Sequence, residues 1–284
     1  MVIKHVHLDG LVASLGGQPD RQYRLWTDGV FDRVPSVIDH AILAVEPDDD
    51  GWILVLRDVS NTLLPDDYVL TRDESRRVLS AVNELHQEFW GEYVEQIPSL
   101  DEYYSVFLRL HTVAADFSIS KLIARGWELF PDVAPPDIAG AMAALLGDPA
   151  LISTELTQHP TTFIHGDLRL HNLGLTADKV VLLDWEITAN APPFVEFAWY
   201  LIISATRVDA SREQIIDDFR EISGEHFDPR ALEIALIGGL ASLGWNKALD
   251  IVENPDPAVR ERERADLDWW IARVRTALET WSPV

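Results

Sequence analysis

The spacing of apolar residues changes near residue 60, and this change restricts the chain to folds that combine a strand-rich segment with a helical one. Before residue 60, Val2–Val6 is a short strand-like run. The apolar runs Ala41–Glu46 and Trp52–Leu56 flank the turn-forming residues Pro47–Gly51, so we expect a β-hairpin there. After residue 70, apolar residues recur at three- and four-residue spacing, which is typical of amphipathic helices.

The first long helix is marked by a capping signal. Thr71 is followed three residues later by Glu74, a capping box that predicts a helix through about Phe89. The same criteria predict further helices at Arg21–Phe31, Asp101–Phe117, Asp137–Leu146, Phe194–Thr206, Ser211–Ile222, Pro229–Leu249 and Pro257–Trp281.

One strand-like island interrupts the helical region. Thr161–Ile164 and Lys179–Leu183 resemble strands. Leu173–Leu175 and Val180–Leu183 are expected to pair across a turn at Thr176–Lys179. We therefore expect an α+β chain of two lobes. A small strand-rich lobe would span residues 1–60, and a large helical lobe with one catalytic β-hairpin would span residues 61–284.

Composition limits the classes of partner. The chain of 284 residues carries a formal charge of −24, which repels nucleic-acid phosphates and anionic lipids, so we expect neither as a partner. Cysteine is absent, which excludes thiolate chemistry and fits a reducing compartment. The N-terminus lacks the apolar core of a signal peptide, and the longest apolar stretches are too short to span a bilayer. A soluble cytoplasmic protein is the default expectation.

Three polar residues of the island have a spacing that suggests chemistry. Asp167 follows the first strand, and Asn172 begins the second five residues later. The hairpin folds back and returns Asp184 close to Asn172, which places an amide oxygen and a carboxylate together as hard ligands for Mg²⁺. Asp167 is left on the loop, free to accept a proton from a hydroxyl. Phosphoryl transfer needs this division between metal ligands and a base.

Two other interpretations of these residues remain open. The three side chains are also compatible with ordinary turn and strand-end positions, where Asp and Asn satisfy nearby backbone groups. Alternatively, His165, Asp167 and His171 could bind zinc, although Asn172 and Asp184 would then have no role.

The segment from His165-Gly-Asp167 to Asp184-Trp-Glu186 resembles the catalytic loop and metal motif of protein kinase-like enzymes. The His-Gly-Asp form is similar to that of the aminoglycoside phosphotransferase and choline kinase-like family. This resemblance implies a two-lobed kinase-like fold, with Asp167 as catalytic base and Asn172 and Asp184 as Mg²⁺ ligands. It also implies that His165 and Glu196 support the catalytic loop.

The resemblance extends to the N-terminal region. Lys4 is placed like the small-lobe lysine that holds the α- and β-phosphates of ATP, although a surface lysine is the alternative. Trp52–Leu56 is similar to the last strand before the kinase hinge. Main-chain groups of the connector, Arg57, Asp58 and Val59, would then bind adenine, unless they are ordinary strand-exit residues.

The chain departs from this family in two ways. The glycine-rich hairpin normally precedes the lysine strand, but Gly10, Gly16 and Gly17 follow Lys4. No Glu occurs before Glu46 to pair with the lysine, and Gln22 or Asp20 are the nearest substitutes. The first strand would expose an unpaired edge, which a second copy of the chain could cover in a homo-oligomer, or the true start could lie upstream.

Two functions follow from these observations. The first is an ATP- and Mg²⁺-dependent phosphotransferase that acts on a hydroxyl of a small molecule, for which an acidic helical lobe favours an amine-bearing acceptor. The second is a pseudokinase-like binding or scaffold protein that keeps the fold without turnover, suggested by the two departures. The residues identify neither the acceptor nor the choice between ATP and GTP.

Overall fold

The computed structural model describes residues 1–7, 20–112 and 118–281, and these divide into two compact units. The first unit combines Met1–Ser99 with Pro160–Phe227, and the second combines Leu100–His159 with Asp228–Val284. Gly10, Gly16 and Gly17, which follow Lys4 in the sequence, lie outside the described residues. The lobe boundary at residue 60 stays a prediction.

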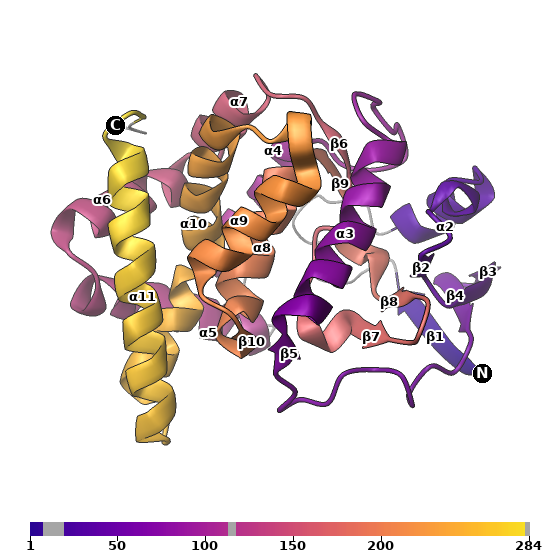
Figure 1. Ribbon diagram of the computed structural model, residues 1–284, viewed down its shortest axis with the longest axis horizontal. Coiled ribbons are helices and arrows are strands. Elements are labelled where there is room, and N and C mark those ends of the chain that lie inside the picture. The colour runs from indigo at the N-terminus through magenta and orange to yellow at the C-terminus, as the bar shows by residue number, and fades with distance from the viewer. Residues whose placement is uncertain (8–19, 113–117, 282–284) are drawn as a thin grey trace. The chain divides into compact units, whose positions relative to one another are not determined.

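The first unit is built from short strands and four α-helices among its described residues (Figure 1). Its strands are β1 (Val2–His7), β2 (Ile38–Asp39), β3 (Ile42–Asp48), β4 (Gly51–Leu56), β5 (Leu70–Thr71), β6 (Thr162–Ile164), β7 (Leu173–Leu175), β8 (Val180–Leu182), β9 (Ala189–Ala191) and β10 (Val208–Asp209). Its helices are α2 (Arg21–Thr27), α3 (Arg72–Glu88), α8 (Pro193–Ser204) and α9 (Arg212–Ser223).

The N-terminal strands form an antiparallel sheet in the order β1-β4-β3, which confirms the predicted hairpin. Lys4 of β1 pairs with Leu54 of β4, so the strand that carries the lysine is held in register with the strand that leads to the connector. β1 lies at an edge of this sheet; a partner that covers this edge stays a prediction. Helix α2 ends at Thr27, shortly before Gly29, whose φ of 72° a non-glycine residue rarely adopts.

The predicted hairpin of the island is present, but it is not isolated. β7 and β8 pair antiparallel, and the turn closes through a hydrogen bond from Thr176 N to Lys179 O. β2 adds a parallel strand to β8, which the sequence did not reveal because it is only two residues long. Gly174 is required in β7, because a Cβ there would lie 2.7 Å from the carbonyl oxygen of Thr62.

A second pairing connects the loop after β6 to helix α8. β6 and β9 are antiparallel, with Ile164 opposite Ala189. β6 leads directly to His165, and β9 leads within two residues to α8. This pairing therefore brings the candidate catalytic loop and the first turn of α8, which carries Glu196, to the same place.

Helix α3 begins as the sequence predicts and anchors the unit. The Thr71 side chain accepts from Glu74 N, and the Glu74 side chain accepts from Thr71 N, which completes the capping box. On its surface, Arg77 donates to the carbonyl oxygens of Thr176 and Lys179 and so holds the turn of the β7–β8 hairpin. α3 also packs against α9, where Asp218 accepts from two of its arginines.

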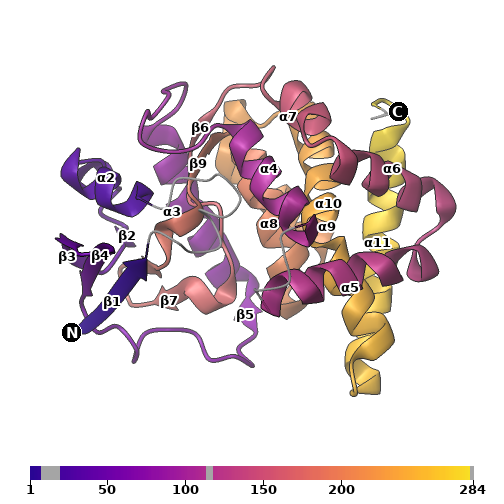
Figure 2. The ribbon, with the colours of Figure 1, turned by 180° about the vertical axis from the view of Figure 1, so that it is seen from behind.

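The second unit is helical in its described residues (Figure 2). It contains α4 (Leu100–Arg109), α5 (Ser118–Val133), α6 (Pro136–Gly147), α7 (Ala150–Leu156), α10 (Pro229–Glu253) and α11 (Pro257–Leu278). Helix α10 is its centre and packs against α5 and α11. The sequence predicted α4, α6, α10 and α11 but missed α5 and α7, and residues 113–117 of the predicted helix Asp101–Phe117 lie outside the described residues. None of the described helices has the length and apolar character needed to cross a membrane.

Candidate active site

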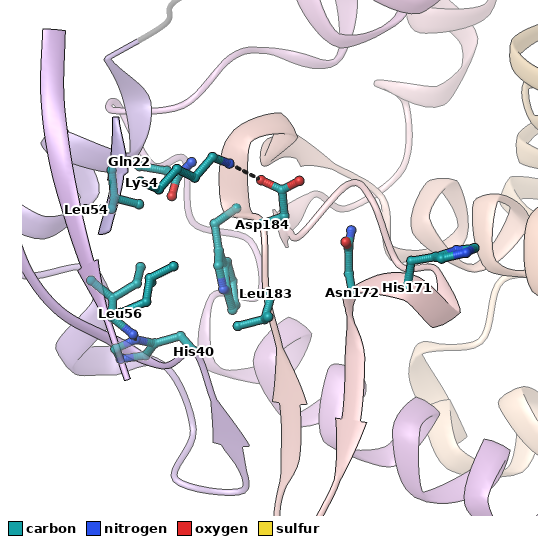
Figure 3. Close-up of a pocket in the computed structure, with 11 residues that line it drawn as sticks. Lys4, Gln22, His40, Leu54, Leu56, His171, Asn172, Leu183 and Asp184 are labelled. Atoms are coloured by element: carbon teal, nitrogen blue, oxygen red, sulfur yellow. Dashed lines mark hydrogen bonds and ion pairs between the residues drawn. The ribbon is translucent and has the colours of Figure 1, made fainter. Parts of the chain in front are cut away.

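The base of the β7–β8 hairpin brings Asn172 and Asp184 together, as the spacing predicted. Asn172 is the residue immediately before β7, and Asp184 lies just after β8. The main chain joins the two ends, because Leu183 N donates to Asn172 O over 2.9 Å. Figure 3 shows the two side chains next to each other at the ends of the adjacent strands. Asp184 has a φ of 67°, in the left-handed region that is uncommon for a non-glycine residue. Such strain is typical of positions that serve a functional site.

Asp167 is buried, and its carboxylate contacts three side chains. Asn172 Nδ2 donates to Asp167 Oδ2 over 2.9 Å, and Trp199 Nε1 donates to Oδ1 over 3.1 Å. The Nε atom of Arg169 lies 3.0 Å from Oδ2 in an ion pair. The role of this carboxylate as a base stays a prediction, and two hydrogen bonds and one ion pair fix its orientation. Trp199 and Arg169 carry no local sequence signal for this role.

His165 is fully buried and uses both ring nitrogens within the loop. Nδ1 accepts from Asp167 N over 3.2 Å, and Nε2 donates to Leu183 O over 3.0 Å. Burial lowers the pKa of His165, which favours the neutral ring that these two contacts require. No ring nitrogen of His165 is left for zinc. Across residues 1–7, 20–112 and 118–281, no three His, Cys, Asp or Glu side chains form a group that could hold a metal.

Glu196 lies against the candidate catalytic loop, where the family resemblance placed it. Its Oε1 accepts from Gly166 N over 2.8 Å, and its Oε2 is 2.8 Å from His86 Nε2. Both side chains are almost completely buried. Gly166 has a φ of 84°, which glycine adopts readily and other residues rarely do. His86 lies 110 residues from Glu196 in the chain, and no local pattern predicted this contact.

Lys4 contacts the hairpin side of the site instead of helix α2. Its Nζ lies 3.0 Å from Asp184 Oδ1 and also forms an ion pair with Glu186. Burial disfavours the charged amine, but the negative charges of Asp184 and Glu186 outweigh it and the pKa of Lys4 is raised.

The suggestion that Gln22 or Asp20 holds the lysine is therefore wrong. Asp20 pairs with Arg24 over 2.6 Å, while the two carboxylates near Lys4 come from the segment after β8. Glu186 is the residue that sequence reasoning missed. The available signal was an acidic side chain two positions after Asp184, in a chain that lacks Glu before residue 46.

The connector after β4 has some of its main-chain groups already occupied. Arg57 N donates to Ala41 O over 2.8 Å, and the carbonyl of Val59 accepts from Thr62. The side chain of Arg57 pairs with Asp39, and that of Asp58 accepts from Ser60 N. A ligand at this connector would therefore bind to its other main-chain groups, such as Arg57 O and Val59 N.

A cavity of about 240 Å³ connects several of these residues (Figure 3). Its polar side is lined by Lys4, Asn172 and Asp184. The other lining residues are mostly apolar, namely Ile42, Leu54, Leu56, Leu183 and Trp185, together with the polar Gln22, His40 and His171. A cavity that combines charged side chains with an apolar lining suits a ligand with an aromatic group and anionic phosphates.

The donor set at the polar side fits Mg²⁺. Because the Asn172 amide donates through Nδ2 to Asp167, its oxygen is directed away from that carboxylate. Asn172 and Asp184 both line the cavity and can offer an amide oxygen and a carboxylate. Mg²⁺ is usually held by one or two protein oxygens together with waters and ligand phosphates, so two protein ligands are sufficient.

Comparison with protein families gives one match. A model described as the phosphotransferase enzyme family matches residues 86–234, which include His86, the catalytic-loop segment and Glu196. A search among curated proteins finds no match.

Solved structures identify the fold. The chain is similar to an aminoglycoside phosphotransferase from Streptomyces rimosus bound to ADP and streptomycin, with 20% identity, a TM-score of 0.51, and coverage of 84% of this chain and 86% of that one. It is also similar to a choline kinase from Streptococcus pneumoniae, with 11% identity, a TM-score of 0.51, and coverage of 98% and 84%. A spectinomycin phosphotransferase bound to ADP and spectinomycin has 14% identity, a TM-score of 0.50, and coverage of 96% and 80%. These similarities confirm the predicted two-lobed α+β kinase-like fold.

Proposed function

The chain belongs to the phosphotransferase enzyme family, and from this premise we propose that it transfers the γ-phosphoryl group of ATP to a hydroxyl of a small molecule. The observation that carries the proposal is the hairpin base. It places Asn172 and Asp184 on one cavity and links Asn172 directly to the Asp167 carboxylate.

The nucleotide would bind between Lys4 and the connector. The Lys4 ammonium lies at the polar side of the cavity and can bind the α- and β-phosphates. The remaining main-chain groups of Arg57, Asp58 and Val59 would bind adenine. Two of the similar structures contain ADP, which supports a nucleotide ligand for this fold.

Asn172 and Asp184 would hold the Mg²⁺ ion. A bound ion would supply positive charge that offsets the charge of the nucleotide phosphates. This also reconciles an anionic nucleotide with a chain of charge −24, because a bound cation reverses the local field.

Asp167 would act as the base. The acceptor oxygen attacks the γ-phosphorus, the bond between this phosphorus and the β–γ bridging oxygen breaks, and the acceptor proton passes to the Asp167 carboxylate. Asn172, Trp199 and Arg169 contact that carboxylate, so their contribution is to hold it in a single orientation. Fixed orientation of the reacting groups is a large part of catalysis in this reaction class.

The acceptor class we propose is a hydroxylated amine. The excess of acidic residues favours a cationic compound. The similar structures include complexes with streptomycin and spectinomycin and an enzyme named as a choline kinase.

The test is a phosphate-transfer screen with ATP and Mg²⁺ against hydroxylated amines and sugars. We expect acceptor-dependent ADP release, and we expect Asp184→Asn to abolish it. Asp178→Asn, in the exposed hairpin turn, is the matched control and should keep full activity. Binding of Mg²⁺ and nucleotide without transfer to any acceptor would instead support the scaffold alternative.

A further inference from the structure

Lys4 has two carboxylate partners, and they are not equivalent. Its Nζ bonds to Asp184 Oδ1 over 3.0 Å and to Glu186 Oε1. We propose that Glu186 is the positioning residue that holds the Lys4 ammonium at the nucleotide cavity once Asp184 has bound a metal ion. This inference rests on the proposed nucleotide and Mg²⁺ site.

Asp184 cannot bind the Lys4 ammonium and a metal ion equally well. Its carboxylate lines the cavity together with Asn172, and a divalent ion there attracts it more strongly than an ammonium does. The metal also repels Lys4. Glu186 is outside the set of residues that line the cavity, so it can stay with Lys4 without occupying the space of the ligand.

Glu186 is held in place by its neighbours. It lies in the single turn of 3-10 helix Trp185–Ile187, and Trp185 is buried with its Nε1 donating to Leu182 O over 2.8 Å. Trp185 also stacks on Phe163, with ring centroids 5.9 Å apart. Helix α2 packs against the same turn. The backbone of Glu186 is therefore fixed from two sides.

Helix α2 supplies no substitute for this carboxylate. Residues 21–27 contain no Asp or Glu, and Asp20 is paired with Arg24. Gln22 of α2 lines the same cavity as Lys4 and is 4% exposed, but it carries no charge. Figure 3 shows Gln22 beside Lys4, so we choose position 22 for a carboxylate in a designed rescue.

The experiment measures the Kd of ADP by calorimetry, with and without Mg²⁺, for the wild type, Glu186→Gln and the double variant Gln22→Glu/Glu186→Gln. With Mg²⁺ present we expect Glu186→Gln to weaken ADP binding about two- to fivefold, since the pair is partly exposed. Without Mg²⁺ the loss should be smaller, because Asp184 still holds Lys4. The double variant should recover most of the affinity.

The control is Glu88→Gln, which removes a partly exposed carboxylate that pairs with Arg33, and it should leave the Kd unchanged. Thermal melts verify that each variant is folded. Wild-type affinity in Glu186→Gln would overturn the inference while leaving the proposed function intact. A second result would also overturn the inference: the Kd of ADP for Glu186→Gln no longer depends on Mg²⁺, and the double variant does not recover affinity. This result would make Glu186 a metal ligand. A wild type that binds no nucleotide would refute the proposed function, and the inference with it.

Discussion

Replacing His86 by leucine is expected to destabilise the first unit through the loss of one contact. His86 Nε2 and Gly166 N both contact the buried carboxylate of Glu196, each over 2.8 Å. Hydrogen bonds to charged groups contribute about 1.5–3 kcal/mol, and removing one partner of a buried charge costs about 3–5 kcal/mol. We therefore expect His86→Leu to lower the free energy of unfolding by about 3 kcal/mol.

The assay is urea and thermal unfolding of His86→Leu, Glu196→Met and the double variant. About 3 kcal/mol corresponds to a fall in Tm of about 6–12 °C for a unit of this size. The double variant should lose less than the sum of the single ones, because it removes the buried charge and its partner together. His5→Leu is the control, because His5 is half exposed, and it should change the stability by less than about 0.5 kcal/mol. Additive losses in the cycle, or a change below about 1 kcal/mol in His86→Leu, would refute the reasoning.

Two further predictions concern helix α3 and the hairpin. The pKa of Asp218 is lowered, first by its hydrogen bonds to Arg72 and then by those to Arg76, so its stabilisation is present at neutral pH and is lost as pH falls below about 4. Asp218→Asn should therefore lower the free energy of unfolding by about 2 kcal/mol at pH 7. Urea titrations should show that the difference from the wild type disappears in acid, and a difference that stays constant with pH would contradict the assignment. Gly174→Ala should lower both the Tm and the affinity for Mg²⁺-ADP, because its Cβ would meet a backbone carbonyl, whereas Gly147→Ala, which has open space, should lower neither.

Local patterns in the sequence were sufficient for much of the fold. The capping box at Thr71 and Glu74 fixed the start of α3, and the apolar runs around the turn at 176–179 predicted the β7–β8 hairpin. That hairpin brought Asn172 and Asp184 together, because a two-strand return requires only local pairing. The central pair of the candidate site was therefore predictable.

The missed elements lack such local signals. Helix α5 contains Gly126 and Pro131, which indicate a break when read locally. Gly126 is explained only by tertiary packing, since a Cβ there would meet the carbonyl oxygen of Trp245 on α10.

The missed contacts of the site are equally non-local. Lys4 and Glu186 are separated by 182 residues, and His86 and Glu196 by 110. No periodicity or spacing in the sequence reports such a pairing. Only the assembled first unit shows that Lys4 depends on the segment after β8.

The central claim is that Asp167 accepts the acceptor proton during phosphoryl transfer. The measurement that tests it most directly is kcat and KM for ATP in Asp167→Asn, on the acceptor found by the screen. Asparagine preserves the size of the side chain but cannot accept the proton, and general-base catalysis typically contributes about 10²- to 10⁴-fold. The account predicts a fall in kcat of that size with little change in the KM for ATP. A variant that keeps the wild-type kcat would contradict it.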